Sequence, residues 1–309
     1  MTKIMPKIMI IAGEASGDLL GADLLTQLRL RVPDLTVLGV GGPRLQAAGL
    51  PPSPFDIHDL AIIGLAEVVR RLPRLWQIHH YLTQQLKQHH PDLLLTIDLP
   101  DFNLLLARRA CRLGVPAIHY VSPQIWAWRT GRIRTMARLY RHLLTLFPFE
   151  PPLFAGSGLP VTFVGHPLVQ RATPSRDRQA MRRQLGFAIN EPLVALLPGS
   201  RMSELQRLLP PMLQTAQQLR QQTPPVQAAL ALAEGVSREQ LLSCCDGNWP
   251  KEIPVCHHDT YNLLHAADVA LVASGTATLE CALIGTPMVV VYRVHPLTYA
   301  IGRRLIRVP

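Results

Sequence analysis

Long hydrophobic runs are missing from this 309-residue sequence, since no apolar stretch reaches the length of a membrane-spanning helix. A secretion signal is missing as well. The opening MTKIMPKIMIIAGEASGD has a basic start, but its short apolar run leads into Gly-Glu instead of a small-residue cleavage site, so we expect a first strand there. These absences predict a protein that stays in the cytoplasm.

Cysteine patterns are also missing. The five cysteines form no C-x-x-C pair and no even framework, which predicts buried or idle thiols in a reducing compartment and argues against structural zinc. The histidine pairs at 79–80, 89–90 and 257–258 do not make metal sites by themselves, because adjacent residues on a helix do not face each other.

Charged residues are scarce, at 17% against 48% hydrophobic residues, which is typical of a folded globular chain. The length allows two domains of ordinary size. The net charge of +10 comes from 31 Lys+Arg against 21 Asp+Glu, and it suits nucleic acid, an anionic membrane or a phosphorylated substrate. Because no RNP, zinc-finger or heptad pattern occurs, the charge by itself does not favour nucleic acid.

Short apolar runs alternate with helical patterns along the whole chain. We predict strands at 7–13, 35–41, 92–98, 116–122, 143–149, 161–165, 192–199, 226–233, 253–257, 269–274 and 287–293. Apolar strands separated by helices indicate parallel sheets buried on both faces. The predicted fold class is therefore α/β, with two Rossmann-like, doubly wound parallel-sheet domains that face each other across a cleft and bind ligand at the carboxyl ends of their strands.

The expected domain boundaries follow from a polar, proline-containing stretch in the middle of the chain. We predict an N-terminal domain over 1–168, a linker over 169–178 and a C-terminal domain over 179–309. The chain stops at RRLIRVP, in or just after a helical pattern, so we expect the second domain to be truncated at its C-terminal end.

The loop AGEASGDLLGA (12–22) follows the first strand and opens a helix. Its glycines are four residues apart, no acidic residue closes the second strand, and no lysine stands where a P-loop requires one, so a dinucleotide fingerprint and a P-loop are both disfavoured. For Ser16 and Asp18 singly we favour structural roles, with Ser16 as a helix cap. For the loop as a whole, including Gly17, we favour ligand contact at the edge of the sheet.

Two loops of the second half predict a nucleotide-diphosphate site. In ASGTATLE (273–280) a buried strand ends at Ser274-Gly275-Thr276 and a helix begins at once, so free N–H groups can bind an anion, and Glu280 can reach ribose hydroxyls. In LLPGSRMSE (196–204), Arg201 follows Gly199-Ser200 and is suited to bidentate contact with phosphate oxygens. The alternatives are a plain helix cap, a surface glutamate and a solvated arginine.

Two segments of the first half carry further candidates. YVSPQIWAWRTGRIR (120–134) sets two tryptophans beside arginines, which fits core packing and a membrane interface or acyl-chain acceptor equally well. TIDLPDFN (96–103) places two carboxylates three residues apart. Without a nearby third ligand a metal site is disfavoured. Asp98 at the strand end is the candidate base, Asp101 is expected to cap the next helix, and Asn103 could orient substrate or Asp98.

The motifs GEASGDLLGA, GVGGP, DLPDFN, YVSPQIWAWR, GHPL, LLPGSRMSE and ASGTATLECAL occur in one order along the chain. Together they closely resemble the lipid-A-disaccharide synthase family, bacterial inverting glycosyltransferases of the two-Rossmann-domain GT-B type. The resemblance implies transfer of 2,3-diacylglucosamine from UDP to 2,3-diacylglucosamine 1-phosphate, giving a β-1,6-linked disaccharide. It also implies no metal or cofactor, and a peripheral protein on the cytoplasmic face of the inner membrane. Family members continue past RLIRVP into a segment that supplies an asparagine to the nucleotide site.

Site residues are carried over on these motifs. The resemblance implies that Asp98 and Arg201 are important for catalysis and that Glu280 binds ribose, while Gly17, Gly199, Ser200, Ser274, Gly275 and Thr276 are the expected UDP-sugar contacts. Expected contacts with acceptor, acyl chains or an anionic bilayer are Ile62, Ile63, Leu65, Val68, Val69, Trp126, Trp128 and Arg129. The alternatives are a UDP-N-acetylglucosamine 2-epimerase-like enzyme, a transferase with a soluble acceptor, or a non-catalytic UDP- or lipid-binding protein; a dehydrogenase is more distant.

Overall fold

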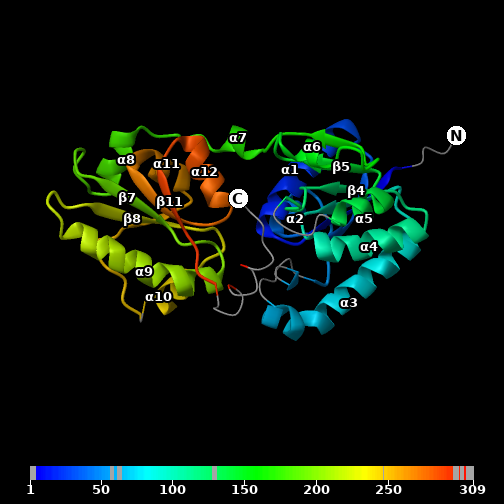
Figure 1. The fold of residues 1–309 in the computed structure, drawn as a ribbon, viewed down its shortest axis with the longest axis horizontal. Helices are drawn as coiled ribbons and strands as arrows, with labels where there is room; N and C mark the ends of the chain where they lie inside the picture. Colours follow the sequence, from blue (N-terminus) through cyan, green and yellow to red (C-terminus); the bar gives the residue numbers. More distant parts are fainter. Residues whose placement is uncertain are drawn as a thin grey trace. The chain divides into compact units, whose positions relative to one another are not determined.

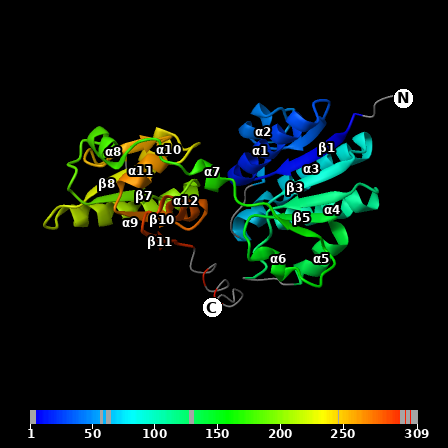
Figure 2. The same ribbon diagram turned by 90° about the horizontal axis from the view of Figure 1, so that it is seen from above.

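The structure is a computed structural model that describes residues 5–55, 59–60, 65–126, 131–245, 247–294, 299 and 303, with the side chains of 65–71 outside the description. The chain divides into two compact units (Figures 1 and 2), with unit 1 running to His166 and unit 2 from Pro167 to His295. The described C-terminal residues Tyr299 and Arg303 group with unit 1, although the sequence predicted one domain over 179–309.

The segment expected to be a linker, 169–178, is packed onto unit 2. Its first residues belong to the short helix α7 (Leu168–Arg171), which contacts α12. The side-chain oxygen of Asn262 accepts hydrogen bonds from the backbone N–H groups of Ser175 and Arg176, at 2.8 and 3.0 Å. These contacts place the boundary of the units before this segment, between His166 and Pro167.

Unit 1 is a parallel sheet of six strands in the order β2-β1-β3-β4-β5-β6. Its elements are β1 (Lys7–Ala12), α1 (Ala15–Arg31), β2 (Thr36–Val40), α2 (Pro43–Ala47), α3 (Leu65–His89), β3 (Leu93–Ile97), α4 (Pro100–Arg112), β4 (Ala117–Tyr120), α5 (Arg132–Leu139), β5 (His142–Thr145), α6 (Glu150–Leu153) and β6 (Val161–Phe163). Five of the six strands lie within the ranges predicted from the apolar runs, and β5 begins one residue before its predicted range of 143–149.

Apolar side chains on successive residues of β1 serve both faces of this sheet, because neighbouring side chains on a strand point to opposite sides. Met9 and Ile11 pack with Ile78 of α3 and Leu106 of α4 on one face. Ile10 and Ala12 pack on the other face with residues of α1 and α2. Burial on both faces explains the continuous apolar runs in the sequence.

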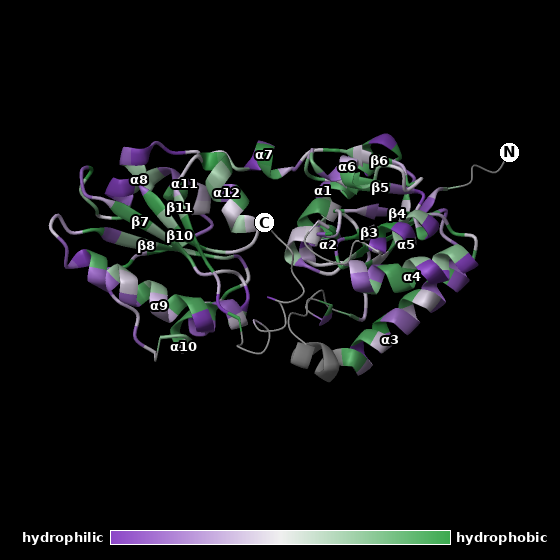
Figure 3. Cartoon of the chain, in the orientation of Figure 1, coloured by the Kyte–Doolittle hydropathy of each residue, from purple (hydrophilic) through white to green (hydrophobic). Residues whose placement is uncertain are grey.

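Unit 2 is a parallel sheet of five strands in the order β11-β10-β7-β8-β9. After α7 come α8 (Arg178–Gln184), β7 (Leu193–Leu197), α9 (Met202–Arg220), β8 (Gln227–Leu232), α10 (Arg238–Ser243), β9 (Val255–His257), α11 (Thr260–Ala266), β10 (Val269–Ala273), α12 (Thr276–Ile284) and β11 (Met288–Val291). Figure 3 shows that β7, β8 and β10 are mainly hydrophobic, whereas α9 alternates between hydrophobic and hydrophilic residues. This is the pattern of a sheet covered by amphipathic helices.

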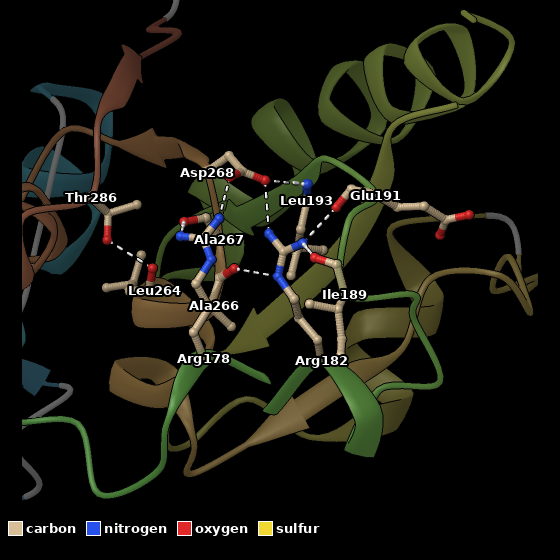
Figure 4. A network of polar contacts seen from close by, with 10 residues as sticks. All are labelled: Arg178, Arg182, Ile189, Glu191, Leu193, Leu264, Ala266, Ala267, Asp268 and Thr286. Atoms are coloured by element: carbon tan, nitrogen blue, oxygen red, sulfur yellow. Dashed lines mark hydrogen bonds and ion pairs between the residues drawn. The ribbon is translucent and has the colours of Figure 1, made fainter. Parts of the chain in front are cut away.

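A buried arginine fixes the amino ends of β7 and β10 in unit 2 (Figure 4). Arg182 of α8 donates to the carbonyls of Ala266, Ile189 and Glu191, and pairs with Asp268 at 2.8 Å. Asp268 also accepts from the backbone N–H of Leu193, at 2.8 Å, and pairs with the more exposed Arg178. This network joins α8, α11, β7 and β10, at the end of the sheet opposite the loops that carry the candidate site.

Each sheet has one point where the chain changes direction. In unit 1 the chain goes from β1 to β2 and then returns to β3 on the other side of β1; in unit 2 it goes from β7 through β8 and β9 to β10 on the other side of β7. Ligands of open α/β sheets bind at the carboxyl ends of the strands at such switch points. The turns after β1 and β3, and those after β7 and β10, are therefore where a site is expected.

Candidate active site

The turn after β3 carries the carboxylate of Asp98 on a left-handed backbone. Asp98 has φ 53° and Leu99 has φ 45°, a conformation that costs non-glycine residues about 1–2 kcal/mol each. The backbone N–H of Asp98 donates to the carbonyl of Tyr120, at 3.0 Å, and its Oδ1 accepts from the N–H of Leu99, at 2.9 Å. Strain of this kind persists where surrounding contacts enforce it, and it is often found at functional sites.

Contacts from two other segments enforce this turn. Asn103 of α4 is completely buried, and its Nδ2 donates to the Asp98 carbonyl at 2.6 Å. Leu99 lies over Gly13 at the end of β1, where an added Cβ would be 1.9 Å from Leu99 Cδ1. The turns after β1 and β3 are therefore packed directly on each other, as a switch point requires.

The expected capping role of Asp101 is wrong. Helix α4 begins at Pro100, before Asp101, and its N-cap is Leu99. Proline suits the first position of a helix because its missing N–H would have no intrahelical acceptor there. Asp101 lies in the first turn, where it is exposed and forms an ion pair with Arg132 of α5. The two carboxylates of DLPD thus have different surroundings, one at the switch point and one on the surface.

The predicted cap of the helix that follows β1 is also wrong. Helix α1 begins at Ala15 with Glu14 as N-cap, so Ser16 lies inside the first turn and is not the cap. Asp18 has a structural role as expected: its buried carboxylate accepts from the N–H groups of Gly42, Arg44 and Leu45 at the start of α2. Gly17 is buried against β3, where an added Cβ would be 3.5 Å from Ile97 Cγ2.

An exposed aromatic cluster lies beyond β4 and β5. Trp126 is 39% exposed and packs edge-to-face on Phe149, which is 50% exposed, with ring centroids 5.2 Å apart. Phe147 stacks on Phe149 at 5.6 Å and contacts His166 at 5.9 Å. Trp126 is therefore a surface residue rather than core, which leaves its ring available to an apolar ligand. Phe149 had no motif around it and was missed by the sequence analysis.

Beneath the Asp98 turn, β3 contributes to a buried polar cluster. Oγ1 of Thr96 is 2.7 Å from His119 Nδ1 and 3.3 Å from the hydroxyl of Tyr140, whose ring stacks on that of His119. His119 is 1% exposed, and burial lowers its pKa to about 3. The imidazole therefore stays neutral at physiological pH, because a hydrogen bond with Thr96 raises the pKa by less than burial lowers it.

Glu204 of α9 fixes the turn after β7. Gly199 has φ 107°, and a Cβ there would be 2.3 Å from Glu204 Oε2, so glycine is required. The same oxygen accepts from the N–H of Ser200, at 3.2 Å, while Oε1 pairs with Arg201 at 3.0 Å. Arg201 is the N-cap of α9, and its side chain is 37% exposed. A partly exposed guanidinium at a helix start can meet an anionic ligand.

The turn after β10 leads directly into α12. Ser274, Gly275 and Thr276 are all exposed, and Gly275 is the N-cap, so the first N–H groups of the helix face an N-cap without a side chain. The positive end of a helix with accessible N–H groups is suited to phosphate. The structure thus brings the predicted triplets 199–201 and 274–276 to adjacent strands, since β7 pairs with β10.

Glu280, in the second turn of α12, has a partner that the sequence did not suggest. The hydroxyl of Tyr261 in α11 donates to Glu280 Oε1, at 3.2 Å. Burial raises the pKa of Glu280, the hydrogen bond from Tyr261 lowers it, and the charge of Glu234 raises it further. Burial together with Glu280 raises the pKa of Tyr261 to about 12, so this phenol remains a donor. Tyr261 therefore orients the carboxylate that was predicted to bind ribose.

Most of the expected lipid contacts lie outside the part of the chain whose side chains are described. Ile62, Ile63, Trp128 and Arg129 lie outside the described residues. Leu65, Val68 and Val69 belong to α3, but their side chains lie outside the description. Among the described residues, no helix has the length and apolarity needed to cross a membrane.

Comparison with known proteins identifies the family. The lipid-A-disaccharide synthetase family profile matches residues 8–309. The chain belongs to the lipid-A-disaccharide synthase family. Relatives with that name include a protein of Myxococcus xanthus, 43% identical over 98% of this chain and 79% of its own length, and one of Syntrophus aciditrophicus, 44% identical over 97% and 78%. The chain is accordingly a glycosyltransferase of lipid A biosynthesis.

Solved structures support the fold of this family member. A UDP-GlcNAc 2-epimerase from Neisseria meningitidis bound to UDP-GlcNAc superposes with a TM-score of 0.61 at 12% identity, covering 96% of this chain and 85% of the other. The glycotransferase of kitacinnamycin gives a TM-score of 0.59 at 16% identity, covering 98% and 85%. The two parallel α/β sheets are thus those of the GT-B fold, as the sequence predicted.

Proposed function

We propose that this chain transfers 2,3-diacylglucosamine from its UDP conjugate to the 6-hydroxyl of 2,3-diacylglucosamine 1-phosphate. The products are the β-1,6-linked disaccharide 1-phosphate and UDP. Family membership supports the reaction class. The observation that carries the proposal is the contrast between the two switch points, since one presents the Asp98 carboxylate and the other presents Arg201 with an open helix start. A base and an anion site are the two elements that this displacement needs.

The proposed chemistry is one inverting displacement. Asp98 accepts the proton of the 6-hydroxyl while this oxygen forms a bond to C1 of the donor sugar. The bond between C1 and the β-phosphate oxygen breaks, and its electron pair leaves with UDP. Arg201 and the N–H groups at the start of α12 stabilise the negative charge that develops on the diphosphate. No step in this scheme requires a metal ion, so we expect a chelator to leave the rate unchanged.

We further propose specific contacts for the two substrates. Gly199, Ser200, Ser274, Gly275 and Thr276 bind the diphosphate of the donor, Glu280 binds its ribose, and the loop that contains Gly17 contacts the donor sugar. The exposed rings of Trp126 and Phe149 suit an acyl chain, because aromatic surface buries favourably against hydrocarbon. Leu65, Val68, Val69, Ile62, Ile63, Trp128 and Arg129 are proposed to meet acyl chains or lipid. The net charge of +10 fits peripheral binding to the anionic cytoplasmic face of the inner membrane.

The test is a product assay with the purified protein. UDP-2,3-diacylglucosamine and the 1-phosphate acceptor are incubated with and without chelator, and disaccharide and UDP are quantified. We expect them to appear in equal amounts. UDP-sugar consumption without disaccharide would indicate an epimerase or hydrolase instead, and binding without turnover would indicate a non-catalytic protein.

A further inference from the structure

One buried residue, Asn103, donates hydrogen bonds to three successive carbonyls at the left-handed turn that carries Asp98. The Nδ2 of Asn103 donates to the carbonyls of Asp98, at 2.6 Å, and Ile97, at 3.4 Å. Its backbone N–H donates to the carbonyl of Leu99, at 3.0 Å. Three successive carbonyls, from the last residue of β3 to the N-cap of α4, are thus bonded to this single residue.

These bonds fix a conformation that the turn would otherwise avoid. Asp98 and Leu99 have φ values of 53° and 45°, in a region that non-glycine residues rarely occupy. The direction of the Cα–Cβ bond follows from the backbone, so the same φ that strains Asp98 also sets where its carboxylate points. Releasing the Asp98 carbonyl would let the turn relax and would redirect that carboxylate.

The oxygen of the Asn103 amide helps to explain why this position holds an asparagine. The residue is 0% exposed, and its Oδ1 has no hydrogen-bond partner among the described residues. A buried unpaired acceptor is unfavourable, and leucine, of similar size, would avoid it. Leucine, however, has no donor for the two carbonyls. The nitrogen must be the end that faces them, because a carbonyl can only accept.

We propose that Asn103 is a positioning residue that holds Asp98 in the orientation required for proton transfer. The inference rests on the proposed function of Asp98 as the base. Asn103 is completely buried and therefore acts through Asp98, without touching substrate. Its loss should lower turnover while leaving substrate binding intact, because misplacing a catalytic group by about 1 Å can cost on the order of 10²-fold in rate.

The test compares Asn103→Leu with the wild type. We expect kcat to fall roughly 10²-fold and KM for both substrates to stay within about twofold. The thermal midpoint should fall less than in Leu106→Ala, because leucine fills the site and removes the unpaired oxygen, although it leaves two carbonyls without their donor. A purely structural asparagine would lower the midpoint and leave kcat of the folded enzyme unchanged. Leu106→Ala, a cavity at another buried position of α4, is the matched control: it should lower the midpoint and leave kcat of the folded enzyme near wild type.

Asp98→Ala and the Asp98→Ala/Asn103→Leu double variant separate the two proposals. If Asn103 acts through Asp98, the second substitution should cost less than about twofold once the base is gone. If the fold losses of kcat in the two single variants multiply in the double variant, the positioning role is overturned. Wild-type kcat in Asn103→Leu would overturn it as well. Wild-type kcat in Asp98→Ala would instead overturn the base assignment.

Discussion

The two switch points both lie between neighbouring parallel strands, β1 and β3 in unit 1 and β7 and β10 in unit 2, but their chemistry is opposite. In unit 1, a non-glycine residue is held in a left-handed conformation and presents a carboxylate, supported by buried Asn103. In unit 2, Gly199 takes the positive φ, and the exposed groups are backbone N–H donors and the guanidinium of Arg201. A parallel sheet brings loops together at its carboxyl edge, and the loop residues alone decide whether that edge accepts a proton or binds an anion.

The first prediction concerns the carboxylate of unit 1. Asp98→Ala should lower kcat by about 10²–10⁴-fold, the usual contribution of a general base, without changing the affinity for UDP. Asp101→Ala is the matched control, because it removes an exposed carboxylate three residues away that pairs with Arg132. Its kcat should stay within about twofold of wild type. Equal losses of kcat in both variants would contradict the assignment of Asp98, and not Asp101, as the base.

The second prediction concerns the amino ends of β7 and β10 in unit 2, far from the loops at the carboxyl ends of these strands. Arg182→Met leaves the carbonyls of Ala266, Ile189 and Glu191 without their buried donor, which should cost about 1–3 kcal/mol of unfolding free energy for each carbonyl that stays unpaired. The ion pair with Asp268 adds less, because that carboxylate is 44% exposed. Arg178→Met removes an arginine that pairs with the same Asp268 but is 43% exposed, so it should cost about 0–1 kcal/mol. Urea unfolding measures both. A change in UDP affinity of the folded Arg182→Met protein would contradict a purely structural role for this end.

The third prediction concerns the anion site. Arg201→Lys keeps the charge and loses the planar fork, and a lost hydrogen bond to a charged group is worth about 1.5–3 kcal/mol, so kcat/KM should fall roughly 10–100-fold. Arg220→Lys, at the other end of α9 and paired with Glu252, should have no effect on kcat/KM. Steady-state kinetics with varied donor concentration measures kcat/KM for both variants, and equal values would contradict a specific role for Arg201.

The fourth prediction is that the units differ in acid sensitivity. The pKa of His119 falls to about 3 on burial, so the unfolded state binds more protons below its own pKa of about 6.5 and unit 1 loses stability as pH falls through that window. At pH 5 the loss is roughly 2 kcal/mol. Desolvation raises the pKa of Asp268 in unit 2, but hydrogen bonds and the charges of Arg178 and Arg182 lower it overall, so the stability that this carboxylate contributes is lost only as pH falls below its normal value of 3.8.

Urea unfolding between pH 7 and pH 5 tests this difference. His119→Gln should flatten the pH dependence of the unfolding free energy. Replacing the exposed His80 by glutamine should leave that dependence as it is. An unchanged slope in His119→Gln would show that another group is responsible.

The smallest expected effect is that of Tyr261→Phe. Loss of the hydrogen bond to Glu280, worth about 1 kcal/mol, should weaken UDP binding about fivefold. The pKa of Glu280 should rise because Tyr261 lowers it, so UDP binding should begin to weaken at a higher pH than in the wild type. Tyr261→Phe should weaken the binding of 2′-deoxy-UDP less than it weakens the binding of UDP. An equal loss of affinity for UDP and 2′-deoxy-UDP would argue against ribose binding by Glu280.

Patterns within one segment were sufficient to predict the eleven strands and the turns after β3, β7 and β10, because burial on both faces and strand-to-helix junctions leave local signals. Helix starts were less certain. Capping by Ser16 and Asp101 was predicted wrongly because α1 and α4 begin earlier, at Ala15 and Pro100. The contacts of Glu204 with Ser200, of Tyr261 with Glu280 and of Phe149 with Trp126 were missed, since most of these pairs join segments far apart in the sequence.

The contact between Gly13 and Leu99 has a consequence for resistance to inhibitors. Every single-base change that replaces a glycine introduces a residue with a Cβ atom or a stop codon. At Gly13 that atom would be 1.9 Å from Leu99 Cδ1 and 2.9 Å from Leu60 Cβ, so the side chains packed around it, that of Leu99 in the Asp98 turn among them, would have to move. A compound that binds at the Asp98 turn would therefore contact a segment whose packing a substitution of Gly13 disturbs.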